Sequence, residues 1–129
     1  MNRVVFPISH ARAVVGLNGY IHAKAIPGAS PEAVHSLGML ADRLSVNIEL
    51  LSEASLTRFA PDKSRAGILE PMAQIMRTSE QSLIESKAMS LARISPPRET
   101  PRFAPAGQST QMIIGATPET DRSIMRLAS

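Results

Sequence analysis

The chain has 129 residues, of which 43% are apolar and 19% are charged. This length supports one modest hydrophobic core, and the composition excludes a membrane-embedded protein. The 14 Lys and Arg against 11 Asp and Glu give a net charge of +3. Because this small excess is spread over both halves, charge alone does not indicate a nucleic-acid partner. Cysteine is absent, which excludes disulfides, thiolate zinc sites and a thiolate-held iron–sulfur cluster within these residues.

The N-terminal residues lack the apolar run of a signal peptide, and no apolar stretch approaches the roughly 20 residues that span a bilayer. We therefore expect a soluble, cytoplasmic chain without a membrane partner. Aromatic residues make up only 3% of the chain, so platforms on which single-stranded nucleic acid could stack are scarce. We place His10 in a loop and His35 on a helix.

A first strand is predicted over residues 19–26, which Pro27 and Gly28 end. Ser30 followed by Pro31 is a helix N-cap with proline at the first helical position, and it predicts a helix over about 31–43. One face of this strand is small or apolar and consists of Ile21, Ala23 and Ala25. The other face is more polar and consists of Tyr20, His22 and Lys24.

The strictest alternation in the chain predicts a strand over residues 44–50. Its polar face carries Ser45, Asn47 and Glu49. Its apolar face carries Leu44, Val46, Ile48 and Leu50.

The middle of the chain reads as helical. Ser52 can cap a short helix over about 53–60, and Asp62 or Ser64 can start a longer one. Pro71 is expected to kink or divide that helix. A further helical stretch is predicted to begin at residues 78–80.

Four prolines between residues 96 and 105 predict a loop over 95–107. A short apolar strand over 110–116 and a helix over about 118–128, entered through Thr117 and Pro118, complete the chain. Strand followed by helix, three times, is typical of a parallel α/β sheet or barrel. Three strands would leave edges open, so we expect the protein to associate or to be part of something larger.

In a closed parallel barrel the polar strand faces point inward. His22, Lys24, Asn47 and Glu49 would then share a cavity at the strand ends, where such folds place their sites. The alternative is an edge strand whose polar face is wetted by solvent. Residues 27–30 and 115–118 each lead into a predicted helix, whose first backbone amides could bind an anion. The alternative is that both turns are plain helix caps.

The sequence shows no metal or nucleophile motif. His10, His22 and His35 have no second ligand at metal spacing. Neither a glycine-rich phosphate loop nor a Gly-x-Ser-x-Gly elbow is present.

Three segments together resemble the middle of a radical SAM protein of the DNA modification or repair type. They are residues 19–30, residues 45–53 with Leu56 and 60–64, and residues 103–121. The resemblance implies an incomplete parallel (β/α) barrel, with about three strands and flanking helices, over residues 1–129. Proteins of this family bind a 4Fe-4S cluster through a Cys-x-x-x-Cys-x-x-Cys loop and S-adenosylmethionine along the strand ends. Because this chain has no cysteine, we interpret it as an internal fragment that cannot hold the cluster and is inactive alone.

The same resemblance suggests which residues would contact S-adenosylmethionine. Ser45, Asn47, Glu49 and Glu53 match the region that contacts its ribose or methionine part. Gly115 and Glu119 match the strand end that lies against adenine, His22 and Lys24 would point into the same lumen, and Gln108 would lie at its rim. Leu51 stands where the family tends to have proline, so the turn after Glu49 can differ.

A second hypothesis is a small basic module without catalysis. Arg93, Arg98 and Arg102 surround the proline-rich loop and would contact nucleic acid. Phosphate contacts release counterions, so such binding would weaken with salt.

Overall fold

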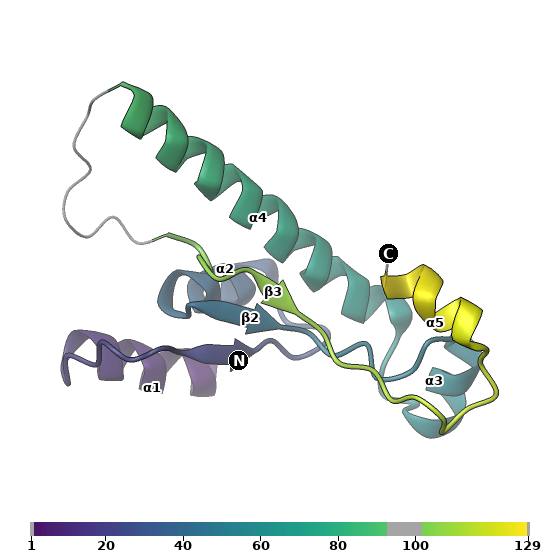
Figure 1. Cartoon of the computed structure of the whole chain (residues 1–129). Coiled ribbons are helices and arrows are strands. Elements are labelled where there is room, and N and C mark those ends of the chain that lie inside the picture. Colours follow the sequence, from purple (N-terminus) through teal and green to yellow (C-terminus); the bar gives the residue numbers. More distant parts are fainter. Residues whose placement is uncertain (1, 93–101, 129) are drawn as a thin grey trace.

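A parallel sheet of three strands lies at the centre of the structure, with β2 (Arg43–Ser45) between β1 (His22–Lys24) and β3 (Gln108–Ser109) (Figure 1). The structure is a computed structural model, and it describes residues 2–92 and 102–128. Five helices lie in these ranges: α1 (Asn2–Ala13), α2 (Pro31–Leu40), α3 (Glu53–Phe59), α4 (Arg65–Leu91) and α5 (Asp121–Ala128). The predicted mixture of helices and parallel strands is therefore confirmed.

One face of the sheet is covered by α2 and α4, and the hydrophobic core lies between this face and the two helices. The register places Ala23 of β1 beside Leu44 of β2, and both are buried against these helices. The predicted apolar faces of the first two strands are thus confirmed. The core consists mainly of aliphatic side chains, and its largest fully buried members are Leu37, Leu44, Leu56, Ile68, Ile75, Val34 and Val46.

Helix α4 is continuous from Arg65 to Leu91 although Pro71 lies inside it. Of the two outcomes expected at Pro71, a kink or a division, the division was wrong, and so was the separate helix from residues 78–80. Proline lacks the N–H that would bond the carbonyl four residues earlier, which belongs to Gly67. The N–H of Gly28 donates to that carbonyl instead, at 3.1 Å. This bond satisfies the freed acceptor and ties the β1–α2 turn to α4.

The N-terminal residues form α1, so His10 lies on a helix and not in the expected loop. The helix packs against α2. A salt bridge links Arg12 to Asp42 at 2.7 Å, and Asp42 also accepts the backbone N–H of Ile21 at 2.7 Å. These tertiary contacts stabilise a helix whose own sequence carries an internal proline and no acidic residue in its first turn.

The pairing between β2 and β3 is shorter than the alternation predicted because a side chain enters the ladder between them. The Thr110 hydroxyl accepts the N–H of Ile48 at 3.2 Å and donates to the carbonyl of Val46 at 2.8 Å. Parallel pairing then resumes as an isolated bridge between Glu49 and Met112. The predicted strand over 44–50 is regular only at its start. The third strand lies at residues 108–109, before the predicted range of 110–116, which contributes only the bridge residue Met112.

Three predicted helix caps are confirmed. Ser30, Ser52 and Ser64 accept the N–H groups of residues three positions later, at 3.3, 3.1 and 3.1 Å. Of the two alternatives for α4, Ser64 is therefore the cap. The predicted start of the last helix was wrong, because α5 begins at Asp121 and Thr120 caps it.

The segment before β3 is fixed to α2 by the buried ring of Phe103, which lies against Gly38. Residues 102–107 form neither helix nor strand, as the loop prediction requires, and residues 95–101 lie outside the described part of the chain. None of the helices in the described ranges combines the length and hydropathy that a membrane span requires.

Candidate functional site

A pocket of about 390 Å³ opens at the carboxyl edge of the sheet. The strand arrowheads point toward this end of the molecule, where α3 and α5 also lie (Figure 1). In parallel α/β folds, ligands bind at this edge. The pocket combines two charged side chains with an apolar wall, and its lining consists of Glu49, Leu50, Phe59, Ala60, Lys63, Ile113 and Ala116.

Glu49 adopts a backbone conformation that is rare for a residue with a side chain. Its φ is 65°, in the left-handed region. Its N–H donates to the carbonyl of Gln111 at 3.1 Å, and its carbonyl accepts the N–H of Ile113 at 2.7 Å. These two bonds hold the strained residue in place. Such strain is concentrated at functional sites, which makes Glu49 the first candidate in the pocket.

The Glu49 carboxylate forms a salt bridge with Lys63, with 3.1 Å between Oε1 and Nζ. The hydrogen bond from Lys63 lowers the pKa of Glu49, while partial burial raises it to a smaller extent. Asn47 and the charge of Lys24 lower this pKa further. Glu49 is therefore ionised at neutral pH, with Lys63 as its salt-bridge partner.

The lowered pKa of Glu49 predicts how the stability of the protein depends on pH. Since the pKa is lower in the folded state, the ionised group stabilises the fold above its unfolded pKa, and this stability is lost as pH falls through the folded pKa. We expect Glu49→Gln to flatten the decline in the free energy of unfolding below about pH 4.5, measured by urea denaturation. An unchanged slope in the variant would show that the pair with Lys63 contributes nothing.

The apolar wall of the pocket is open to solvent. Phe59 at the end of α3 is 57% exposed, and Ile113 after β3 is 44% exposed. The guanidinium of Arg58 lies 5.1 Å from the centre of the Phe59 ring. An exposed ring and an exposed branched side chain beside a salt bridge suit a ligand with one charged end and one flat, apolar end.

Two of the sequence-predicted site residues act on a third. Asn47 and the charge of Lys24 both lower the pKa of Glu49. His22 lies on the same face of β1 as Lys24, and both are exposed. Ser45 pairs with Lys24 in the register and is buried.

Asn47 is also buried, and its amide donates to the side chain of Gln111 at 3.5 Å. Ser45 in β2 and Asn47 just after this strand form a polar row, opposite the helix-covered face. The predicted polar face of this strand exists, but it is largely covered.

Three other predicted residues lie elsewhere. Gln108 pairs with Leu44, so it lies on the helix-covered face of the sheet and not with Lys24. Glu53 is exposed in the first turn of α3, and Gly115 is exposed with a φ of 84°. None of the three lines the pocket around Glu49.

Glu119 belongs to a second polar cluster. One carboxylate oxygen accepts the hydroxyls of Ser55 at 2.6 Å and Ser52 at 2.8 Å. The Ser55 hydrogen bond lowers the pKa of Glu119, with partial burial opposing it and Ser52 adding to it. This contact holds Glu119 in the segment before α5, which explains why the helix begins later than predicted. A neighbouring pocket of about 320 Å³ is lined in part by Glu119, Ser52 and Arg65.

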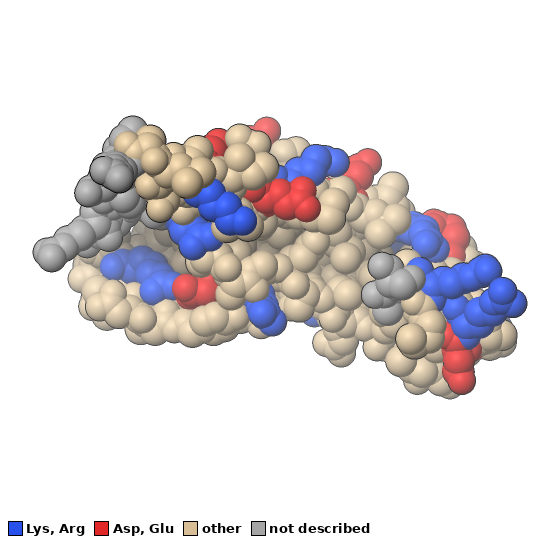
Figure 2. All heavy atoms as spheres, turned by 45° about the horizontal axis from the view of Figure 1, so that its top comes forward, with Lys and Arg blue, Asp and Glu red and all other residues tan. Residues whose placement is uncertain are grey.

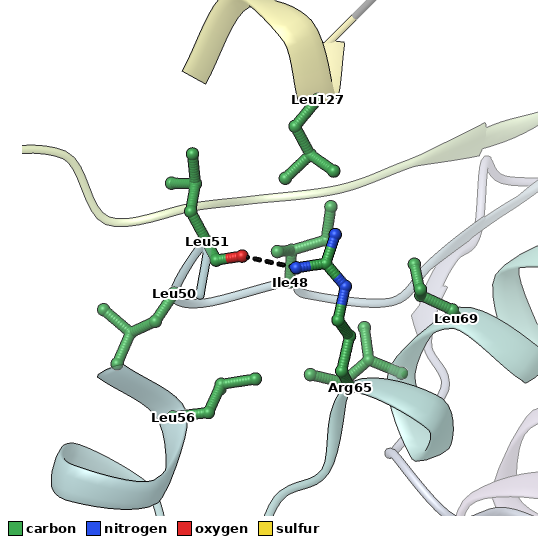
Figure 3. Close-up of a pocket in the computed structure, with 8 residues that line it drawn as sticks. Ile48, Leu50, Leu51, Leu56, Arg65, Leu69 and Leu127 are labelled. Carbon is green, nitrogen blue, oxygen red and sulfur yellow. Dashed lines mark hydrogen bonds between the residues drawn. The ribbon is translucent and has the colours of Figure 1, made fainter. Parts of the chain in front are cut away.

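A small apolar cavity lies beneath this region, between α3, α4 and α5 (Figure 3). Arg65 crosses it and donates to the carbonyl of Leu51 at 2.8 Å. Its volume of about 10 Å³ is close to the smallest that holds one water molecule. The cavity is therefore a packing feature of the α3–α5 region and not a ligand site. Its apolar lining consists of Ile48, Leu50, Leu51, Leu56, Ile68, Leu69 and Leu127.

Sequence reasoning did not find Lys63, Phe59 or Ile113 as site residues. Lys63 lies 14 residues after Glu49, in the turn between α3 and α4, and no periodic pattern links the two. Phe59 lies at the end of α3, where an apolar residue is typical of core packing. Phe59 and Lys63 lie beside Glu49 only because α3 and the turn after it pack against the strand ends.

The basic residues of the second hypothesis are only partly described. Arg102 is exposed, whereas Arg93 and Arg98 lie outside the described residues. On the face shown in Figure 2, blue and red side chains are interspersed over most of the surface. That face therefore does not carry a broad field of one sign.

Within residues 2–92 and 102–128, no three His, Cys, Asp or Glu side chains lie close enough to hold a metal ion. Comparisons with protein-family models, with curated proteins and with solved structures find no match to this chain. The site must therefore be interpreted from its own chemistry.

Proposed function

We propose that the pocket around Glu49 and Lys63 binds S-adenosylmethionine, as part of a (β/α) barrel of the radical SAM type that acts in DNA modification or repair. The observation that supports this proposal most strongly is the Glu49–Lys63 salt bridge beside an exposed apolar wall at the carboxyl edge of the sheet. The resemblance of residues 19–30, of 45–53 with Leu56 and 60–64, and of 103–121 to that family points to the same edge.

The charges of the pocket match the methionine end of this ligand. An amino-acid group carries an ammonium and a carboxylate, which can bind Glu49 and Lys63 respectively and replace the salt bridge between them. Each protein charge would exchange one partner for another, so neither would be left unpaired on binding. A side-chain hydrogen bond from Asn47 lowers the pKa of Glu49, so this amide can help to orient the Glu49 carboxylate.

The apolar wall matches the nucleoside end. Adenine has a flat face that gains from contact with aromatic and branched side chains, and Phe59 and Ile113 offer such surface. The pocket volume of about 390 Å³ lies in the range usual for small-molecule sites. Charged and apolar regions therefore lie next to each other, as the ligand requires.

The iron–sulfur cluster of the family does not fit this chain. Thiolates hold such clusters, and the 129 residues contain no cysteine. We therefore propose binding without cleavage of the ligand by this chain alone. The barrel architecture is part of the proposal, supported by three parallel strands in chain order with helices on one face and His22 and Lys24 exposed on the other.

Isothermal titration of the whole chain with S-adenosylmethionine tests the proposal. We expect saturable binding that Glu49→Gln weakens by about tenfold, which corresponds to about 1.4 kcal/mol. Adenosine alone and methionine alone should each bind more weakly than the intact ligand, because each contacts only one region of the pocket.

Asp62→Asn is the matched control, because it removes an exposed acid beside Lys63 without changing the pocket lining. It should bind as the unaltered chain does. The proposal fails if the chain shows no saturable binding, or if Glu49→Gln and Asp62→Asn have equal affinity. Salt-sensitive binding of DNA in place of S-adenosylmethionine would support the basic-module hypothesis instead.

A further inference from the structure

The outer side of α4 carries apolar side chains that the body of the protein does not cover. The helix buries Ile68, Pro71 and Ile75 on its inner side, and Ser82 on the same side accepts the N–H of Phe103. On the outer side, Ile84 is 61% exposed and Leu91 is 85% exposed. We call this outer side the α4 stripe, and its residues are Met76, Glu80, Leu83, Ile84, Lys87 and Leu91.

The order of residues in the α4 stripe is symmetric about the point between Leu83 and Ile84. Glu80 lies three residues before Leu83, and Lys87 lies three residues after Ile84. Met76 lies seven residues before Leu83, and Leu91 lies seven residues after Ile84. An apolar residue is thus balanced by an apolar residue, and an acid by a base.

This symmetry has a consequence for two copies of the helix. If two α4 helices pack antiparallel about a two-fold axis at this point, Leu83 lies opposite Ile84 of the other copy and Met76 opposite Leu91. Each Glu80 then lies opposite a Lys87, which forms the same salt bridge twice. A parallel pair in register would instead place Glu80 against Glu80 and Lys87 against Lys87, which is repulsive.

The two charges have no competing partner in the described part of the chain. The salt bridges there are Arg12–Asp42 and Lys63–Glu49, so neither Glu80 nor Lys87 is paired. Seven positions along a helix separate them by about 10 Å, which is too far for an intrahelical pair. Both charges are therefore available to a second copy.

From this charge and apolar complementarity we propose that the α4 stripe is a self-association surface, through which two copies of the chain form an antiparallel dimer. The contact extends over about 22 Å of helix, from Met76 to Leu91. Since one helix from each copy contributes, the dimer is weak and concentration-dependent.

Sedimentation equilibrium of the whole chain over a range of concentrations tests this proposal through charge reversal. We expect Glu80→Lys and Lys87→Glu each to raise the dimer dissociation constant by about tenfold or more, because like charges then face each other. The double variant Glu80→Lys/Lys87→Glu should restore dimerisation, since the pairs form again with their signs exchanged.

Glu85→Lys is the matched control, because it makes the same change of charge at an exposed residue on the other side of the helix. It should dimerise as the unaltered chain does, and circular dichroism should show equal helicity in every variant. A chain that stays monomeric at all concentrations would overturn the proposal. So would single reversals that behave like Glu85→Lys, or a double variant that is no better than either single one.

Discussion

Phe103→Ala is expected to lower the free energy of unfolding by about 3–5 kcal/mol, the largest effect of any substitution considered for this chain. The ring is 3% exposed and fills the space between α2 and the segment that leads into β3. It also lies 5.8 Å from the ring of His35. Removing it leaves a cavity in a core whose other large side chains are aliphatic. Urea denaturation followed by circular dichroism measures the change.

The loss should extend to the candidate site. Next to Phe103, the N–H of Ala104 donates to the carbonyl of Gly38 at 2.8 Å. The N–H of Ala106 donates to the carbonyl of Asp42, also at 2.8 Å. These contacts position β3 and, beyond it, the bridge between Met112 and Glu49. His35→Ala, which removes only the ring contact, should cost clearly less. Equal losses in the two variants would contradict the cavity argument.

The second large effect is expected at Gly38, where Phe103 occupies the space of a side chain. A Cβ at this position would overlap the ring of Phe103. Gly38→Val should therefore lower the free energy of unfolding by about 3 kcal/mol, at the upper end of typical overpacking costs. The same denaturation measurement applies. Gly38→Ala should cost less, because alanine favours a helix more than glycine does and partly offsets the overlap.

A double variant tests whether the two positions act through one contact. In Gly38→Ala/Phe103→Leu, the smaller leucine leaves room for the added methyl group. The combined loss should therefore be smaller than the sum of the single losses, which is the sign of direct coupling. Strictly additive losses would show that Gly38 is required for a reason other than the Phe103 ring.

The packing of Phe103 against Gly38 matters for the proposed function because the candidate site has little regular structure of its own. Glu49 lies in an isolated bridge with a left-handed φ, and its partner Lys63 lies in a turn. What holds the two together is the packing of α3, α4 and the β3 segment around them. We expect the core variants to lose ligand binding in parallel with stability, whereas Glu49→Gln should lose binding with a smaller change in stability.

The sequence by itself determined the features that depend on neighbouring residues. The caps at Ser30, Ser52 and Ser64 follow from a hydroxyl placed three residues before an N–H that lacks a helical partner. The apolar residues that face the helices, Ala23 in β1 and Leu44 in β2, follow from the two-residue period of a strand, whereas the burial of Ser45 does not. The mixed fold with parallel strands follows from the order of these elements.

The tertiary structure decided what depends on residues far apart in the chain. Gly28 satisfies the carbonyl that Pro71 leaves free, so α4 stays whole, and Thr110 interrupts a ladder that alternation alone would extend. The salt bridge between Glu49 and Lys63 also depends on tertiary structure, because it joins a strand end to a later turn. Local patterns carry no information about such partners, since only the packed core brings them within hydrogen-bond distance.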